Sequence, residues 1–488
     1  MNVAIIVSSG ISAGGGFQYE IKVASLVAQH FGADQPYTAK IFSPVMSVVE
    51  QYKKAGVAVT FIETGDLERV LIEQHQTDVV YFLNPSNLCT KLVSLPYIVT
   101  VWDLCHRDFP EFPEVRSNFE FDRRENFFHG GALTKAIAVV VDSELGKQNM
   151  IERYGVDPSR VKVLKFLPRL SSFDDTVLDV KAKYGIQNNY IFYPAQFWAH
   201  KNHIYIIKAL QLLKSNYNLV IDVVFSGKDY GNLNYILEQA KLLGVAEQVH
   251  YIGFVDDSEI PSLYKNSMAL VMPTYFGPTN IPPLEAFSYG VPVCYSDLPG
   301  LRDQVSGAAF LMDLTEPDCL AKILSELHAT PEVADKLLVA AKQLLASWTD
   351  QDFVKAVSDI FAEFSIRRSC WGRQCYIRPT NTSFEEKFFM VSKFLRDNTH
   401  LSKIVIYGSG TVGDIIYALL PEKVVAFVDK KADYASESFQ SSGTYAPESL
   451  RHMDYDSVLI SVLGREEEIK DYLVGQLGVA EEKILGFY

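Results

Sequence analysis

The stretch VMPTYFGPTNIPPLEAFSYGVPVCYS, residues 271–296, joins two apolar runs through a loop rich in proline. Proline restricts a backbone, and at the start of a helix it costs no hydrogen bond. The segment Pro282–Phe287 therefore predicts a helix start that follows a strand. Glu285 falls in its first turn, where a carboxylate can complement the helix dipole or accept hydrogen bonds from vicinal hydroxyl groups. The residues alone leave both roles open.

Three segments of the chain begin alike, with an apolar strand, a turn and an amphipathic helix. They are VAIIVSSGISAGGGFQYEIKVASLVAQHF from residue 3, YIFYPAQFWAHKNHIYIIKALQLL from residue 190 and KIVIYGSGTVGDIIYALL from residue 403. Further strands are predicted at Val57–Phe61, Val79–Phe82, Tyr97–Trp102, Ile137–Val141, Leu219–Phe225, Val249–Ile252, Ala269–Met272 and Val291–Tyr295. Apolar strands that alternate with helices predict parallel sheets covered on both faces.

The predicted fold class is therefore α/β, with two Rossmann-like domains and a third, smaller Rossmann-like domain. The predicted limits are 1–180 and 181–366 for the first two domains, 367–395 for a linker and 396–488 for the third domain. The polar joint LPRLSSFDDT, residues 167–176, separates the first two. The linker begins with a run of arginines that contains no acidic residue.

The overall composition excludes several classes of protein. The net charge of −14 over 488 residues argues against nucleic-acid binding, because phosphate neutralisation needs a basic surface. The N-terminus lacks a basic signal-peptide region, and no apolar stretch is long enough to span a membrane. The six cysteines have no disulfide or zinc-site spacing. We therefore expect a cytoplasmic protein.

Several motifs, in order along residues 1–366, resemble glycosyltransferase family 4. The segment PTYFGPTNIPPLEAFSYGVPV is similar to the donor-site motif of that family, and YPAQFWAHKNH to its phosphate-binding turn. VWDLCHRDFPEFP resembles the segment on the acceptor side. The resemblance implies the GT-B arrangement of two Rossmann-like domains and a retaining transfer from a nucleotide-diphosphate sugar. It implies that neither a metal nor a cofactor is required.

The resemblance also implies the site residues. Lys201 would contact the donor diphosphate, Glu285 would hold the ribose hydroxyls, and Asp103 with His106 would lie beside the sugar and the acceptor. The implied catalytic residues are Asp103, His106, Lys201 and Glu285, and the implied donor-binding residues are Gly14, Gly15, Gly16, Gln196, Lys201, Thr279, Asn280, Ile281 and Glu285. The backbone amides of Asn280 and Ile281 would face the phosphates or the transferred sugar.

Three positions depart from the family pattern. Gly277 stands where the family has a first glutamate, Gln196 where it has an arginine, and Trp102 where it has a histidine. Thr279 and Asn280 could hydrogen-bond the sugar in place of the missing glutamate.

The third unit carries Gly408, Gly410 and Gly413 in G-x-G-x-x-G spacing between a strand and a helix, and Asp429 ends the next strand. This context is typical of domains that bind a nucleotide or NAD. No Tyr-x-x-x-Lys pair follows, which argues against a short-chain dehydrogenase. A structural or oligomerising unit and a nucleotide- or NAD-binding unit both stay open.

We therefore interpret the chain as a transferase that adds a sugar to an oligosaccharide or lipid-linked saccharide for a surface polysaccharide. Peripheral contact with the inner face of the membrane and homo-oligomerisation through the third unit are further expectations. Candidate membrane contacts are the arginines at 367, 368, 373 and 378 and the cluster DRREN at 122–126. Two alternatives stay open, an NAD-dependent nucleotide-sugar oxidoreductase and a non-catalytic sugar-nucleotide-binding protein.

Overall fold

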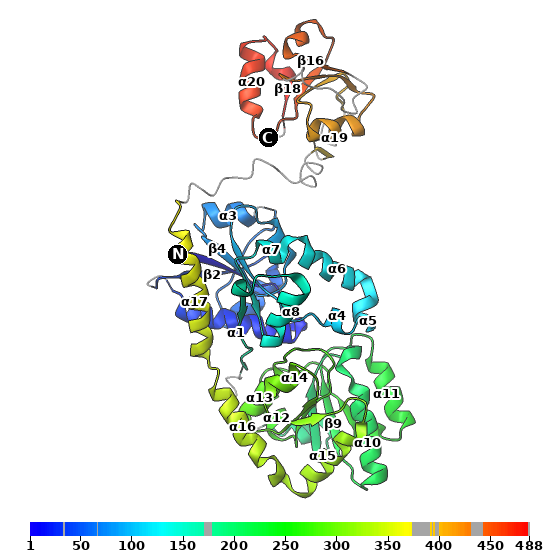
Figure 1. Ribbon diagram of the computed structural model, residues 1–488. Coiled ribbons are helices and arrows are strands. Elements are labelled where there is room, and N and C mark those ends of the chain that lie inside the picture. The colour runs from blue at the N-terminus through cyan, green and yellow to red at the C-terminus, as the bar shows by residue number, and fades with distance from the viewer. Residues whose placement is uncertain are drawn as a thin grey trace. The chain divides into compact units, whose positions relative to one another are not determined.

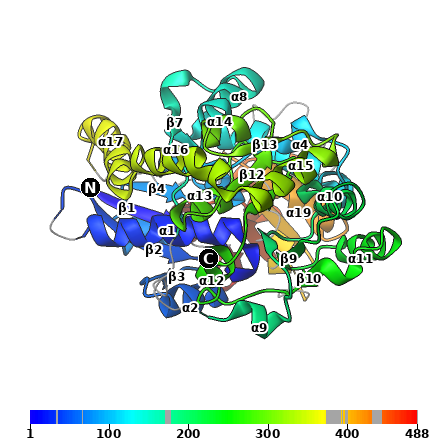
Figure 2. The same cartoon turned by 90° about the horizontal axis from the view of Figure 1, so that it is seen from below.

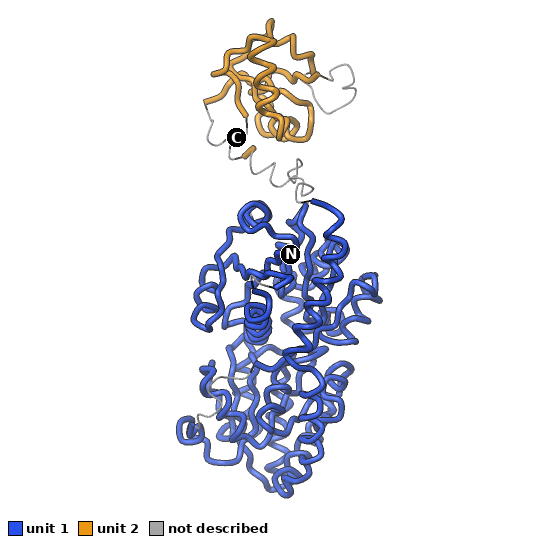
Figure 3. The backbone as a smooth tube through the Cα atoms, turned by 90° about the vertical axis from the view of Figure 1, so that its left-hand side faces the viewer, with its two compact units in different colours: residues 1–376 blue, residues 377–488 orange. Residues whose placement is uncertain are grey.

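The computed structural model describes residues 1–32, 35–65, 67–169, 178–372, 391–392, 394–395, 400–430 and 443–486. The chain divides into two compact units, residues 1–376 and 377–488, coloured separately in Figure 3. The first unit contains two lobes, each built on its own parallel sheet.

The first lobe, drawn from blue to cyan in Figure 1, is built on a seven-stranded sheet in the order β3-β2-β1-β4-β5-β6-β7. Its strands are β1 (Asn2–Ile6), β2 (Thr38–Ser43), β3 (Thr60–Phe61), β4 (Val79–Phe82), β5 (Tyr97–Thr100), β6 (Ala138–Val141) and β7 (Val161–Val163). Its helices are α1 (Gly15–His30), α2 (Met46–Lys54), α3 (Leu67–Glu73), α4 (Cys105–Asp108), α5 (Pro113–Arg116), α6 (Glu120–Phe127), α7 (Leu133–Lys135) and α8 (Glu144–Tyr154).

Alternate residues of the central strand β1 enter two different cores. Ile5 packs in a cluster with residues of α1, while Ile6 packs in a cluster with residues of α3 and α7. Successive side chains of a strand point to opposite faces of the sheet, so each face is covered by its own helices. This double burial explains why the strands read as continuous apolar runs.

The second lobe is a six-stranded sheet in the order β10-β9-β8-β11-β12-β13. Its strands are β8 (Tyr190–Pro194), β9 (Asp222–Ser226), β10 (Val249–Tyr251), β11 (Leu270–Met272), β12 (Val293–Ser296) and β13 (Phe310–Met312). Its helices are α9 (Val180–Tyr184), α10 (His203–Asn216), α11 (Leu233–Leu242), α12 (Ile260–Lys265), α13 (Pro282–Ser288), α14 (Leu301–Val305), α15 (Pro317–Ala329) and α16 (Asp335–Ala346).

The last helices of the first unit connect the two lobes. Helix α16 packs on α13 of the second lobe, whereas the next helix, α17 (Asp350–Arg368), packs on α1 of the first (Figure 2). Thr349 caps α17, since its hydroxyl accepts the backbone N–H of Asp352 at 3.3 Å. The buried face of α17 includes Phe361, which lies in the same core as Ile5.

The second unit contains a third parallel sheet, in the order β16-β15-β14-β17-β18. Its strands are β14 (Ile404–Tyr407), β15 (Val424–Val428), β16 (Thr444–Tyr445), β17 (Ser457–Ile460) and β18 (Ile484–Leu485), and its described helices of seven or more residues are α19 (Thr411–Leu419) and α20 (Glu466–Gly475). Ile406 packs with residues of α19, and Tyr407 with residues of α20.

The predicted α/β class with three parallel sheets is confirmed. The predicted domain limits at 180/181, 366/367 and 395/396 stay predictions, because the chain divides into only two compact units. Most of the predicted joint at 167–176 and of the predicted linker at 367–395 lies outside the described residues.

The packing of α17 on the first lobe gives a stability prediction. Phe361 has no exposed surface, so we expect Phe361→Ala to lower the free energy of unfolding by about 3–5 kcal/mol, through lost apolar burial and the cavity left behind. Urea denaturation measures this. The control Lys355→Ala, on an exposed part of α17, should change the free energy by less than about 0.5 kcal/mol. Equal effects of the two substitutions would contradict the packing of α17.

Candidate active site

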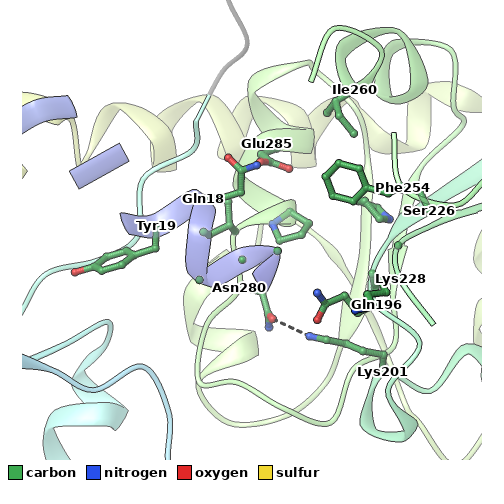
Figure 4. A pocket seen from close by; sticks show the side chains of 18 of the residues that line it. Gln18, Tyr19, Gln196, Lys201, Ser226, Lys228, Phe254, Ile260, Asn280 and Glu285 are labelled. Carbon is green, nitrogen blue, oxygen red and sulfur yellow. Dashed lines mark hydrogen bonds between the residues drawn. The ribbon is translucent and has the colours of Figure 1, made fainter. Parts of the chain in front are cut away.

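A cavity of about 880 Å³ lies between the two lobes of the first unit (Figure 4). Its walls come from the start of α1, from segments that follow β5, β8, β9, β10 and β11, and from the start of α13. The carboxyl ends of parallel strands meet at one edge of a sheet, which is where ligands of such folds bind.

All nine of the donor-binding residues proposed from the sequence line this one cavity. They are Gly14, Gly15, Gly16, Gln196, Lys201, Thr279, Asn280, Ile281 and Glu285. Gly14 to Gly16 belong to the first lobe and the others to the second, so the cavity brings together residues far apart in the sequence.

Lys201 provides an ammonium group in the cavity that has no ion pair with a described residue. Its Nζ atom lies 3.5 Å from Oδ1 of Asn280, as the dashed line in Figure 4 marks. The turn that carries it is fixed by the hydroxyl of Tyr193, which donates to the backbone carbonyl of Lys201 at 2.8 Å. Burial lowers the pKa of Lys201 to about 8. A half-buried cation of this kind favours an anionic ligand.

Glu285 lines the same cavity from the first turn of α13. The hydroxyl of Tyr264, on α12, donates to its Oε2 atom at 3.0 Å. Burial raises the pKa of Glu285 to about 7, and the hydrogen bond from Tyr264 opposes that rise. Figure 4 shows the amide of Gln18 beside the carboxylate. Glu285 thus offers a hydrogen-bond acceptor at a polar corner of the cavity.

Gly14, Gly15 and Gly16 differ in their surroundings. Gly14 has φ +61°, and an added Cβ would lie 3.1 Å from Nε2 of Gln196. A Cβ at Gly16 would lie 3.0 Å from the ring of Trp102, whereas a Cβ at Gly15 would meet no heavy atom within 4 Å. Helix α1 starts at Gly15 without a side-chain cap. A ligand could therefore approach the backbone closely at Gly15, where the helix dipole is positive.

Two groups proposed to bind the sugar-nucleotide donor already have hydrogen-bond partners within the protein. Gln196 connects the lobes, because its Nε2 donates to the backbone carbonyl of Ser12 at 2.9 Å and its Oε1 accepts Nε1 of Trp198 at 3.0 Å. The backbone N–H of Asn280 donates to Oε1 of Gln304 at 3.0 Å. That amide is therefore engaged within the second lobe, which differs from the expectation that it faces the ligand.

The structure does not bring Asp103 and His106 to the cavity wall. Burial would raise the pKa of Asp103, but an ion pair with Arg124 at 2.8 Å and the backbone N–H of Cys105 hold it below its usual value. His106 has no exposed surface, and its Nε2 lies 2.6 Å from Oε1 of Glu125. Both side chains are held by residues of α6, Arg124 and Glu125. The sequence around Asp103 and His106 does not reveal these partners.

The basic residues considered as membrane contacts also have intramolecular partners. Arg367 lies 3.5 Å from Glu363, Arg368 lies 3.0 Å from Asp78, and Arg123 lies 2.6 Å from Glu120. Arg373 and Arg378 lie outside the described residues. None of the described helices has the length and apolar character needed to cross a bilayer.

The cavity also contains residues that the sequence analysis did not select. Ser226, the last residue of β9, and Lys228 line it, and the ammonium of Lys228 lies 5.2 Å from the ring centre of Tyr230. The polar segment SGKD, at the end of an apolar run, could have indicated these residues. Its strand β9 lies beside β8, which precedes Lys201, so the ends of both strands meet at the same edge of the sheet. Asp142, discussed below, contacts the cavity residue Thr279 from the other lobe.

Two of the three glycines of the G-x-G-x-x-G motif in the second unit are closely packed. A Cβ at Gly408 would lie 2.6 Å from Cγ2 of Val462, and one at Gly413 would lie 2.6 Å from the carbonyl oxygen of Gly408. Gly410 is open, because a Cβ there would meet nothing within 4 Å. Asp429 accepts the backbone N–H and the hydroxyl of Ser409, both at 3.0 Å. No set of three or more metal-ligating side chains clusters in the described part of either unit.

Residues 179–344 match the family "Glycosyl transferases group 1". The chain is 22% identical to the O-antigen chain mannosyltransferase RfbU of Salmonella typhimurium over 365 residues, which are 70% of this chain and 96% of that protein. This chain is a glycosyltransferase with the GT-B fold. The family match and the relative support the activity, and two solved structures show the fold.

The first of those structures is a glycosyltransferase from Rickettsia africae, with a TM-score of 0.59 at 16% identity, which covers 74% of this chain and 98% of that one. The second is Alr3699/HepE of Anabaena in complex with UDP, with a TM-score of 0.57 at 16% identity, which covers 75% of this chain and all of that one. Residues 400–485 of the glycosyltransferase match a separate family, "C2185-like, N-terminal".

The buried ammonium of Lys201 predicts a gain of stability when it is removed. The pKa is lowered from 10.5 to about 8 in the folded chain, so between these values the unfolded chain holds more protons and stability rises with pH. Below about pH 8 the full cost of burying the cation remains. We expect Lys201→Met to raise the free energy of unfolding near pH 7 by about 1–3 kcal/mol.

Urea denaturation at several pH values measures this effect, with Lys208→Met as the matched control. Lys208 is an exposed residue of α10, so its replacement should leave the free energy within about 0.5 kcal/mol of the original. A loss of stability in Lys201→Met would mean that the ammonium is well compensated in the folded chain.

Proposed function

We propose that this glycosyltransferase transfers a sugar from a nucleotide-diphosphate donor to a saccharide acceptor, with retention of the anomeric configuration. One observation carries the proposal: the ammonium of Lys201 and the carboxylate of Glu285 line the same cavity between the two lobes. In the proposed complex, Lys201 contacts the diphosphate, and Glu285 accepts hydrogen bonds from the ribose hydroxyls.

The proposed chemistry follows from the charges that develop during transfer. Departure of the nucleotide places negative charge on the diphosphate and positive charge on the anomeric carbon of the sugar. Lys201 and the uncapped start of α1 at Gly15 would stabilise the leaving phosphate. Lys228 lines the same cavity and adds a second cation. These cationic groups would take the part that a metal ion has in other transferases.

The proposed biological setting is synthesis of a surface polysaccharide. It is supported by the similarity to a mannosyltransferase of the O-antigen chain. An oligosaccharide or a lipid-linked saccharide would be the acceptor, and a lipid-linked acceptor would require contact with the membrane surface. A UDP-sugar donor is supported by the fold shared with a UDP-bound structure.

The first experiment is a thermal-shift and turnover screen with UDP-, GDP-, dTDP- and ADP-sugars. We expect one group of donors to stabilise the protein and to be turned over, and Lys201→Ala and Glu285→Ala to abolish both effects. Binding without hydrolysis or transfer would favour a non-catalytic sugar-nucleotide-binding protein. A response to NAD(H) with no response to any sugar nucleotide would favour an oxidoreductase.

Glu285 gives a prediction about the ribose. We expect Glu285→Gln to weaken binding of the selected ribonucleoside diphosphate about tenfold, because an amide is a poorer acceptor for two hydroxyl groups. Isothermal titration with the 2′-deoxy analogue should show a smaller difference between the two proteins. An equal loss for both nucleotides would contradict the ribose assignment.

Lys201 gives a prediction about pH. Because its pKa in the free protein is about 8, the ammonium loses its proton as the pH rises above that value, and attraction for the diphosphate falls. We expect the affinity for the nucleoside diphosphate to fall about tenfold between about pH 7 and pH 9.5. In Lys201→Gln the affinity should be low and should show no such fall over this range. A similar fall in that variant would assign the titration to another group.

A further inference from the structure

Asp142 is a buried carboxylate at the place where the two lobes meet. It follows β6 and is 3% exposed. Its Oδ1 atom accepts the hydroxyl of Ser143 at 3.0 Å, and its Oδ2 atom accepts the hydroxyl of Thr279 from the second lobe. Among the described residues, no lysine, arginine or histidine forms an ion pair with Asp142. A buried acid without a cation is costly, so its hydrogen bonds decide how it is held.

The start of α8 lies next to the carboxylate of Asp142, and a glycine at position 146 leaves the space that the carboxylate occupies. A Cβ added at Gly146, in the first turn of α8, would lie 3.2 Å from Oδ1 of Asp142. The positive end of the α8 dipole lies next to the carboxylate and favours its charged form, whereas burial opposes this and raises the pKa of Asp142 to about 7. A Cβ at Gly300 would lie 2.8 Å from Leu145 and 2.9 Å from Pro278. The start of α8 therefore packs directly against the loop that carries Thr279.

The neighbouring position 277 has no space for a side chain. A Cβ added at Gly277 would lie 2.6 Å from Cδ2 of Leu301. The thiol of Cys105 donates to the carbonyl of Gly277 at 2.9 Å, and its sulfur lies 3.2 Å from the backbone nitrogen of that residue. Residue 277 therefore offers no polar side chain to the cavity, and Thr279 is the next position of the loop that can.

The hydroxyl of Thr279, a residue of the cavity wall, is held in a defined state by Asp142. Thr279 lines the cavity next to Asn280, whose Oδ1 is 3.5 Å from the ammonium of Lys201. If Glu285 holds the ribose and Lys201 the diphosphate, the loop residue beyond Asn280 faces the group attached to that diphosphate. A hydroxyl has one hydrogen and two lone pairs. Because Asp142 takes the hydrogen, only the lone pairs of Thr279 remain for a ligand.

We propose that Asp142 is a positioning residue that holds the hydroxyl of Thr279 as a hydrogen-bond acceptor for a hydroxyl group of the transferred sugar. This inference rests on the proposed function of the cavity and specifies its substrate class, a sugar with a free hydroxyl at that point. A deoxy sugar would leave the acceptor unpaired, which sites of this kind reject strongly. Since Asp142 and Thr279 belong to different lobes, the sugar contact is complete only in the lobe arrangement seen here.

The test compares Asp142→Asn, Thr279→Val and Thr279→Ser in the full chain at about pH 8. Binding is measured with the nucleoside diphosphate that the screen selects from UDP, GDP, dTDP and ADP, and turnover with its sugar derivative. We expect Asp142→Asn and Thr279→Val to keep the nucleotide affinity within about twofold and to lose about 10–100-fold in kcat/KM for the sugar nucleotide. Thr279→Ser should keep most of the activity, because it retains the hydroxyl.

Two further variants make the test specific. The double variant Asp142→Asn with Thr279→Val should lose no more kcat/KM than the more severely affected single variant, because both changes remove the same contact. Asp222→Asn is the matched control, because Asp222 is also buried and hydrogen-bonded but lies at the opposite end of β9 from the cavity. We expect it to lower stability while the ratio of sugar-nucleotide turnover to nucleotide affinity stays unchanged.

Three results would overturn the inference. Equal losses for the nucleotide and the sugar nucleotide in Thr279→Val would indicate a structural role only. If Thr279→Val and Asp142→Asn both keep the full activity of the unaltered protein, the proposed contact with the sugar is refuted. If Asp142→Asn does not fold, Thr279→Val alone decides, because Thr279 is half-buried. Failure of the unaltered protein to bind any sugar nucleotide would instead refute the proposed function, and the inference with it.

Discussion

The ammonium of Lys201 is the group on which the arrangement of the site depends. It lies in a cavity between two lobes with an amide oxygen as its described partner, and burial shifts its pKa toward neutrality. A cation in that environment is poorly solvated, so an anion that enters the cavity gains more than it would in water. The fold therefore has to hold the two lobes together on either side of the cavity that contains this ammonium.

The contacts between the lobes explain how the cavity is maintained. Helix α17 carries the chain back to the first lobe, where Phe361 packs into the core of the first sheet. Next to the cavity the contacts are both polar and apolar. Gln196 bonds to Ser12 and Thr279 to Asp142, while the ring of Phe112 packs on that of Phe276 and Ile281 is buried in the core of the first lobe.

Local patterns in the sequence sufficed for the sheets and for part of the site. The apolar run Val79–Phe82 is β4 itself, because a strand buried on both faces needs no information from its partners. Lys201 is proposed from the resemblance of its segment to a family motif, and Glu285 from the same resemblance and from its place in the first turn of a predicted helix. Asp103 and His106 were placed in the cleft, but their partners Arg124 and Glu125 lie on a helix that folds back over them. Asp142 was missed since its partner is Thr279, in the other lobe.

Three buried or half-buried charged groups at or near the cavity have pKa values close to neutrality. Burial raises the pKa of both Asp142 and Glu285 to about 7, and it lowers that of Lys201 to about 8. The three groups therefore change charge within a narrow range of pH, and Lys201 and Glu285 line the cavity that a ligand would enter. A diphosphate would hold the proton on Lys201, whereas hydroxyl groups that donate to Glu285 would favour its charged form. A donor that carries both groups satisfies the two ends of the cavity at once, which neither a free phosphate nor a free sugar can do.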